Sequence, residues 1–202
     1  MPLPLILVAV GIVAASAVVY KLTRAPGDVD PELDPELDPE TAQDDAEPDA
    51  GVFDGKALRA LSRDEAVVAV YNLAIDEGAS PGWAALVASH AALETGWYEH
   101  FVDSNIFGLT AAPGEPSIKA KDSGDGWLNF RDFATVREGV AAYISWIRRK
   151  APAAEGAGDD EDTEVYSLYL KNAGYYSAPL EQFSATLKSI HGRVSGILEN
   201  AE

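Results

Sequence analysis

The chain contains no cysteine among its 202 residues, which excludes disulfide bridges and thiolate metal sites. Basic residues are scarce as well, because 15 Lys and Arg face 33 Asp and Glu, for a formal net charge of −18. This balance argues against nucleic acid as a partner and against electrostatic docking on anionic lipid. No glycine-rich phosphate loop precedes a helix, and no serine lies in a nucleophile-elbow motif.

Residues 3–20 lack any charged side chain and are almost entirely apolar. As a helix they would span about 27 Å, close to the hydrocarbon thickness of a bilayer. Interface-type residues follow this run, namely Tyr20, Lys21 and Arg24. We therefore predict a single transmembrane anchor over residues 1–24. The alternative is a cleaved signal peptide, because Ala15-Ser16-Ala17 is a small-residue cleavage pattern, although no basic residue precedes the apolar run.

Residues 25–51 have the composition of a linker. The sequence Asp-Pro-Glu-Leu occurs at 30–33 and again at 34–37, and residues 27–50 contain eleven acidic residues and no basic one. Proline favours extended backbone and like charges repel, so we predict a stiff, disordered spacer that either tethers or merely solubilises the rest of the chain. The globular domain then covers residues 52–202.

Helical periodicity dominates residues 52–202, with one polar insertion. A capping-box pattern at Ser62 and Glu65, and a Ser80-Pro81 start, mark the first two helices. The expected helices cover residues 62–74, 81–94, 135–149, 163–172 and 180–198, and residues 151–162 are expected to be an acidic loop. Short strands are expected at 119–121 and 127–130, within a loop-rich lobe over 103–131. This predicts a mainly α domain with a small β-lobe, a layout that suits a cleft.

Glu94 is the principal catalytic candidate. It ends the apolar helix 81–94 and is followed by Gly96 and Trp97. Burial raises the pKa of a carboxyl group, and a neighbouring indole would help to keep it protonated as a general acid. The alternative is a surface glutamate at a helix end. His90 lies four residues earlier and could face the same metal, but no third ligand follows at a suitable spacing, so we expect no metal or cofactor.

Residues typical of a carbohydrate cleft follow Glu94. Asn105 offers a donor and an acceptor to sugar hydroxyl or acetamido groups, Phe107 an apolar face, and Gly108 close backbone approach. Trp127 and Tyr175 add aromatic surfaces on which sugar rings stack. Each aromatic residue could equally belong to the core, to which Trp146 is assigned.

Four blocks in this order, ALETGW, SNIFGL, NFRDF and AGYYSAP, resemble the peptidoglycan-cleaving glucosaminidase family. The resemblance covers about residues 60–192. It implies a lysozyme-like α+β fold with a small β-lobe, the catalytic acid at Glu94, a cleft block at Asn105, Phe107 and Gly108, and a cleft tyrosine at Tyr175.

The chain departs from the family pattern at three positions: Thr110 replaces the usual lysine, Ala178 an aspartate and Tyr176 an alanine. The second carboxylate of some family members has no clear counterpart, and the candidates are Glu115, Asp122 and Asp125. Three routes remain open, namely assistance by the substrate's N-acetyl group, inversion through a lobe carboxylate, and a transglycosylase outcome. Glu94 is the general acid in each.

These observations predict a membrane-anchored peptidoglycan hydrolase that cleaves β-1,4 bonds of the bacterial wall. Peptidoglycan lies outside the inner membrane, whereas the basic residues after the span would keep the domain in the cytoplasm by the positive-inside rule. A location facing the periplasm, or in the membrane of a phage virion that uses the enzyme at entry, meets the first requirement. The alternatives are a non-catalytic glycan-binding module on an anchor and a purely structural membrane protein.

Overall fold

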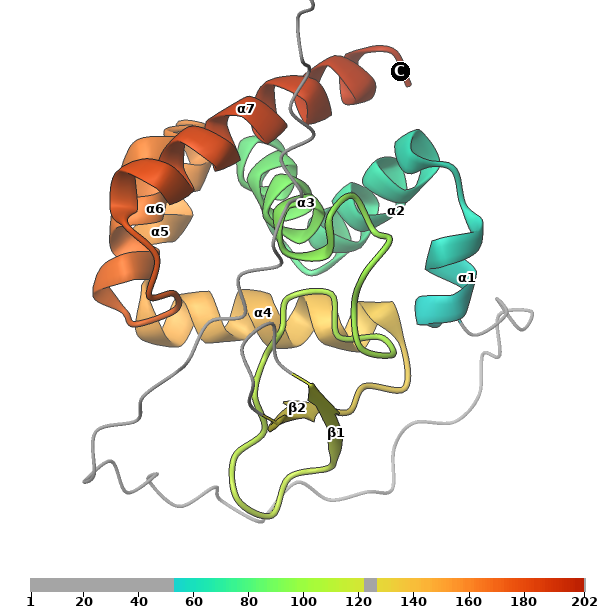
Figure 1. Ribbon diagram of the computed structural model, residues 1–202. Helices are drawn as coiled ribbons and strands as arrows, with labels where there is room; N and C mark the ends of the chain where they lie inside the picture. Colours follow the sequence, from blue (N-terminus) through green and yellow to red (C-terminus); the bar gives the residue numbers. More distant parts are fainter. Residues whose placement is uncertain (1–52, 122–126, 202) are drawn as a thin grey trace, which may run out of the picture.

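Helices make up most of the chain that the structure, a computed structural model, describes, which is residues 53–121 and 127–201 (Figure 1). In order, the elements are α1 (Gly55–Ala60), α2 (Arg63–Asp76), α3 (Pro81–Thr95), β1 (Ser117–Lys121), β2 (Trp127–Arg131), α4 (Val136–Lys150), α5 (Ala153–Asp159), α6 (Thr163–Asn172) and α7 (Leu180–Glu199). The predicted mainly helical domain with a small β-lobe is confirmed. The predicted anchor and linker lie outside the described residues, and no helix over 53–121 and 127–201 is long and apolar enough to cross a bilayer.

Helix α3 is the centre of the fold, with α2, α5 and α7 packed against it. Every side chain from Trp83 to Ala92 is buried, so this helix is apolar around its whole circumference. Ser80 caps its first turn by accepting a hydrogen bond from the Trp83 amide, with Pro81 at the first helical position. Local sequence therefore fixes the start of the helix, and burial from all sides holds it in place.

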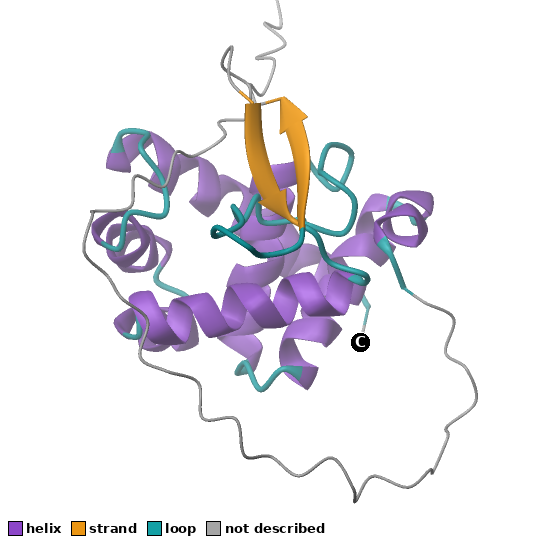
Figure 2. Cartoon of the chain, turned by 90° about the horizontal axis from the view of Figure 1, so that it is seen from below, coloured by secondary structure: helices purple, strands orange, loops and turns teal. Residues whose placement is uncertain are grey.

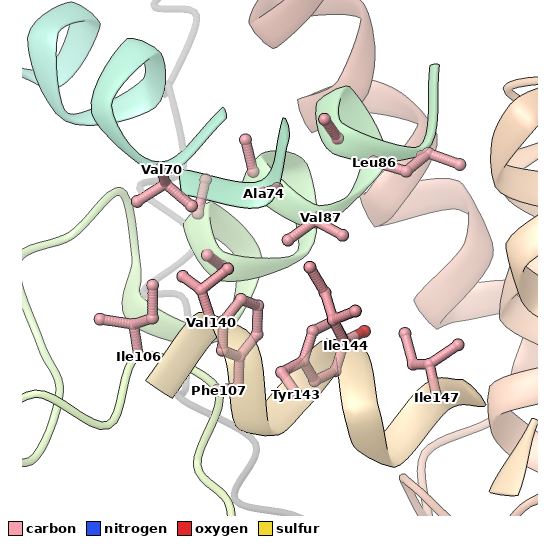
Figure 3. Close-up of a cluster of buried hydrophobic side chains, with 14 of the residues drawn as sticks. Val70, Ala74, Leu86, Val87, Ile106, Phe107, Val140, Tyr143, Ile144 and Ile147 are labelled. Atoms are coloured by element: carbon pink, nitrogen blue, oxygen red, sulfur yellow. The ribbon is translucent and has the colours of Figure 1, made fainter. Parts of the chain in front are cut away.

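The hydrophobic core joins α2, α3, α4 and the loop after α3 (Figure 3). The labelled side chains of this core are Val70 and Ala74 from α2, Leu86 and Val87 from α3, Ile106 and Phe107 from the loop, and Val140, Tyr143, Ile144 and Ile147 from α4. The SNIFGL block therefore supplies core residues, which fixes the loop that carries it against α4.

The two strands form one antiparallel hairpin that projects from the helical body (Figure 2). Its register pairs Ser117 with Arg131 and Lys121 with Trp127. The loop before it is joined to β2, because the Arg131 amide donates to the Leu109 carbonyl at 2.8 Å and Thr110 bridges Phe130. The hairpin and the SNIFGL loop thus form one connected lobe.

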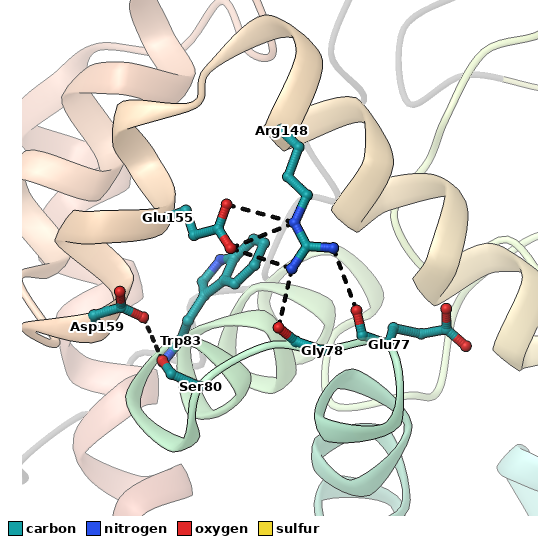
Figure 4. Close-up of polar contacts among 7 residues, drawn as sticks. All are labelled: Glu77, Gly78, Ser80, Trp83, Arg148, Glu155 and Asp159. Carbon is teal, nitrogen blue, oxygen red and sulfur yellow. Dashed lines mark hydrogen bonds and ion pairs between the residues drawn. The ribbon is translucent and has the colours of Figure 1, made fainter.

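The structure contains two helices that the sequence pattern did not predict, α1 and α5. Helix α5 lies in the expected loop 151–162 and packs beside α3, where a Cβ atom on Gly158 would lie 2.4 Å from Cδ1 of Trp83. Glycine lowers the helix propensity of this segment, its small residues give no apolar period, and the contact with Trp83 shows why Gly158 is needed. Arg148 reinforces the junction, since its guanidinium binds Glu155 and the Gly78 carbonyl (Figure 4).

Candidate active site

Glu94 lies in the last turn of α3, with its side chain 9% exposed. Its Oε1 is 3.1 Å from Nε2 of His90, one helical turn earlier. Burial raises the pKa of Glu94 well above its ordinary value. Glu94 is therefore a carboxyl group that keeps its proton far better than a glutamate in water, which is the property a general acid requires.

His90 is fully buried, and five aromatic rings surround it. Ring centroids lie 4.9 to 6.3 Å from the imidazole for Tyr175, Tyr143, Phe183, Phe107 and Tyr166. Burial among these rings lowers the pKa of His90 from 6.5 to about 3. Because the imidazole is neutral, its contact with Glu94 is a hydrogen bond rather than an ion pair.

Two sequence blocks that are distant along the chain meet at this histidine. The phenol of Tyr175 donates to the Phe107 carbonyl at 2.6 Å. The Phe107 ring stacks on Tyr143, with centroids 3.9 Å apart and an interplanar angle of 3°. Tyr175 and Phe107 are both buried, so they pack around His90, the residue that contacts Glu94.

Asn105 organises the loop after α3. Its side-chain amide donates to the carbonyls of Leu109 at 2.8 Å and Arg131 at 3.1 Å, and its Oδ1 accepts from the Leu109 amide at 3.0 Å. Because Asn105 is 2% exposed, this hydrogen-bonding capacity serves the backbone of the lobe. Gly108, in the same loop, is exposed and has a φ of +61°, a conformation that glycine adopts at little cost.

Trp127 lies at the first position of β2 and is 62% exposed. The ammonium of Lys119 on β1 is 5.8 Å from the centroid of its ring. A tryptophan this exposed contributes little to folding, and much of its ring is accessible from solvent beside the Lys119 ammonium. Trp127 is thus a predicted substrate contact whose aromatic ring is exposed.

Trp97, the indole expected beside Glu94, lines a groove of its own. Its ring lines a groove between α2 and α7, together with Val68 and Ile197, and the Arg63 guanidinium lies 4.9 Å from it. The chain turns sharply after Glu94, since Gly96, Trp97 and Tyr98 all have φ between 59° and 66°. The side-chain contact of Glu94 in the described residues is with His90, and the four-residue spacing of these two residues is the sequence signal for it.

Glu115 is the candidate second carboxylate that the structure describes. It accepts from the Ala112 amide at 2.7 Å and from the Arg131 guanidinium at 3.1 Å. These bonds tie Glu115 to β2 and to the loop before β1. Asp122 and Asp125 lie outside the described residues. Over residues 53–121 and 127–201, no three His, Asp or Glu side chains are grouped as metal ligands.

Comparison with solved structures identifies two proteins with a similar fold. The peptidoglycan hydrolase of Sphingomonas sp. A1 superposes with a TM-score of 0.55 at 18% identity, over 66% of this chain and 90% of that one. The glycoside hydrolase domain of Salmonella typhimurium FlgJ superposes with a TM-score of 0.52 at 22% identity, over 68% of this chain and 92% of that one. The chain shares the fold of these hydrolases.

The resemblance drawn from the four sequence blocks is thereby confirmed in the fold. A glutamate-to-alanine mutant of the Sphingomonas hydrolase matches with a TM-score of 0.55 at 17% identity, over 66% of this chain and 93% of that one. No family model matches the chain, and no curated protein matches it in sequence.

Proposed function

We propose that this protein hydrolyses peptidoglycan, cleaving β-1,4 glycosidic bonds with Glu94 as the general acid. The observation that carries the proposal is a carboxyl group, 9% exposed at the end of an otherwise buried helix, whose pKa is raised by burial. The shared fold with two solved hydrolases supports it, because this carboxyl belongs to the ALETGW block on which the resemblance rests. The specificity that we propose is that of an endo-β-N-acetylglucosaminidase.

In the proposed reaction, Glu94 gives its proton to the glycosidic oxygen as the bond to the anomeric carbon breaks. The route that we propose for this step is attack of the substrate's own N-acetyl group on the anomeric carbon, with Glu115, held by Arg131 and the Ala112 amide, as the described alternative. The Glu94 carboxylate then removes a proton from the water that opens this intermediate. Retained configuration in the product, seen by proton NMR, agrees with this route, whereas inversion indicates Glu115, Asp122 or Asp125, and an anhydro end indicates transglycosylation.

The substrate contacts that we propose fall into two groups. Trp127 stacks on a sugar ring, and Gly108 allows the glycan to approach the backbone, since both are exposed. Asn105, Phe107 and Tyr175 are buried and act by shaping the cleft wall and loop behind the acid.

The test is Glu94→Gln in the full-length chain. Glutamine has the size of glutamate but no transferable proton, so we expect release of reducing ends from purified peptidoglycan to fall by more than about a hundredfold. Glu99→Gln is the matched control, because Glu99 is exposed and only five residues away. Circular dichroism confirms folding of both variants. Full activity of Glu94→Gln would remove the assignment.

The rival function is a glycan-binding module without turnover. A zymogram separates the two, because an enzyme clears a peptidoglycan gel, whereas a binder cosediments with the polymer and leaves it intact. The rival rests on the departures at Ala178 and in the lobe rather than on a feature of the acid itself.

We further propose that residues 1–24 anchor the protein in a membrane and that residues 25–51 act as a spacer. The uncharged run 3–20 and the eleven acidic residues of 27–50 support this proposal. The enzyme would then act from the inner membrane facing the periplasm, or from a phage virion membrane at entry. Release from membranes by alkaline carbonate would contradict the anchor, and detection in purified virions would select the second location.

A further inference from the structure

Glu94 is the outer end of a chain of hydrogen bonds that runs into the core. Its Oε1 contacts Nε2 of His90 at 3.1 Å, and Nδ1 of His90 contacts the Tyr143 hydroxyl. That hydroxyl lies 2.9 Å from the hydroxyl of Tyr166. Helices α3, α4 and α6 each contribute to the chain, and His90, Tyr143 and Tyr166 are all fully buried. None of these three belongs to the four blocks that carry the resemblance.

A neutral imidazole has one N–H, so the chain can be ordered in two ways. In the first, Nε2–H of His90 donates to Glu94, Nδ1 accepts from Tyr143, and Tyr143 accepts from Tyr166. In the second, every bond is reversed, and the proton of Glu94 lies on Oε1, pointing at His90. The two orders therefore place the proton of the acid on different oxygens.

The buried end of the chain selects the first order. In the second order the Tyr166 hydroxyl accepts from Tyr143, and its own hydrogen finds no acceptor within the described residues, at a fully buried site. The indole N–H of Trp83 lies near the Tyr166 oxygen and lowers the pKa of Tyr166, although the two do not form a regular hydrogen bond. An indole N–H only donates, so it disfavours a Tyr166 hydrogen directed toward it.

We propose that His90 is a positioning residue, whose Nε2–H, fixed by Tyr143 and Tyr166, donates to Oε1 of Glu94 and confines the transferable proton to Oε2. Within the described residues Oε2 has no hydrogen-bond partner. It is also not fully buried, because the indole nitrogen of Trp83 is the fully buried side-chain atom that lacks a partner there. The proton is thus held on the oxygen that a substrate can reach. The inference deepens the proposed function and rests on it for its catalytic consequence.

The same tautomer serves before and after proton transfer. Once Glu94 has given up its proton, Nε2–H still donates to Oε1, now to a carboxylate, so no group in the core has to move. The titratable groups that face the imidazole are Glu94 on its own helix, Tyr143 from α4, Tyr166 from α6 and Tyr175 from the loop before α7. Burial raises the pKa values of Tyr143 and Tyr166, so neither brings a charge to the chain.

The first test reads the tautomer directly and does not require activity. Histidine ¹⁵N spectra of the full-length chain contain three imidazoles, and the signals missing in His90→Gln identify His90. We expect protonated Nε2 and unprotonated Nδ1 at neutral pH, unchanged in mildly acidic buffer. An Nδ1–H tautomer or an imidazolium would overturn the proposal, whether or not the protein cleaves peptidoglycan.

The second test compares His90→Gln with His90→Leu. A glutamine amide can donate to Oε1 and offer its carbonyl to Tyr143, so we expect the kcat of His90→Gln to be within about threefold of the parent. Leucine fills the space without a donor, so His90→Leu should lower kcat at least about tenfold with little change in KM. Loss of the N–H should also raise the pKa of Glu94 and move the alkaline limb of the rate profile to higher pH. His191→Gln, at the other well-buried histidine, is the control and should leave rate and profile unchanged.

Equal activities and identical pH profiles for His90→Gln and His90→Leu would overturn the positioning role, since a residue that only fills space cannot distinguish a donor from its absence. If the parent protein releases no product, the proposed function fails on its own. The ¹⁵N spectra then decide the hydrogen-bond order separately.

Discussion

The burial of His90 predicts a large loss of stability in acid. Its pKa falls from 6.5 to about 3 in the folded protein. The unfolded chain therefore takes up a proton near pH 6.5, whereas the folded protein does so only near pH 3, so the free energy of unfolding decreases as the pH falls between these values. Integrating the linkage relation with these two values gives a loss of about 2 kcal/mol at pH 5 and about 3 kcal/mol at pH 4.

Glu94 must be removed from the measurement, because it acts in the opposite direction. Its raised pKa means that the folded state holds a proton that the unfolded chain releases above about pH 4.5, so its share of stability is lost as the pH rises. Comparing Glu94→Gln with the double variant Glu94→Gln/His90→Gln leaves His90 as the titrating difference. Urea unfolding followed by tryptophan fluorescence, at about pH 7.5 and about pH 5, gives the two free energies.

We expect the single variant to lose about 2 kcal/mol more than the double variant between these two pH values. A constant difference between the variants, within the error of the extrapolation, would refute the reasoning. It would mean that the folded protein admits a proton to His90 nearly as readily as the unfolded chain does, through water or through an acceptor close to the imidazole.

Two further predictions concern packing and substrate contact. Gly158→Ala should lower the free energy of unfolding by about 1–3 kcal/mol, because the added methyl would lie 2.4 Å from Cδ1 of Trp83. Gly156 has open space around it, so Gly156→Ala should raise the free energy of unfolding by up to about 1 kcal/mol. Equal melting temperatures for the two variants would show that α5 is not packed as described. Trp127→Ala should weaken cosedimentation with insoluble peptidoglycan without changing the melting temperature, since the ring is 62% exposed; unchanged binding would exclude Trp127 from the cleft.

Local sequence signals predicted the helices with strong starts. The Ser62–Glu65 capping box and the Ser80-Pro81 start both appear in the structure with their expected hydrogen bonds. Helices α1 and α5 escaped prediction for different reasons. Helix α1 has six residues, too few for an apolar period to show. Helix α5 consists largely of glycine and alanine, which give no apolar period, and only its Gly158 is explained by the contact with Trp83.

The candidate site was only partly accessible from sequence. Glu94 could be found because a carboxyl group interrupts a buried helix. The role of Asn105 could not be predicted, because the sequence does not show whether its amide binds the backbone or a sugar. The direction of Trp97 could not be predicted either, because the left-handed turn that carries it includes two non-glycine residues. The partners of His90 come from α4, α6 and the loop before α7, so no local pattern connects them.

The attachment of α1 determines how the domain responds to mechanical load. A pull on the amino-terminal side of Phe53 reaches the start of α4 as well as α1, because the Phe53 carbonyl accepts from the Val136 amide at 3.0 Å. Helix α1 itself is held by the bonds from the Gly55 amide to Ser104 and from Arg59 to the Phe101 carbonyl, and by Leu58, which is fully buried in the core. Detaching α1 would therefore break these bonds, expose Leu58 and load the segment that leads into Asn105, while α3 stays packed on all sides.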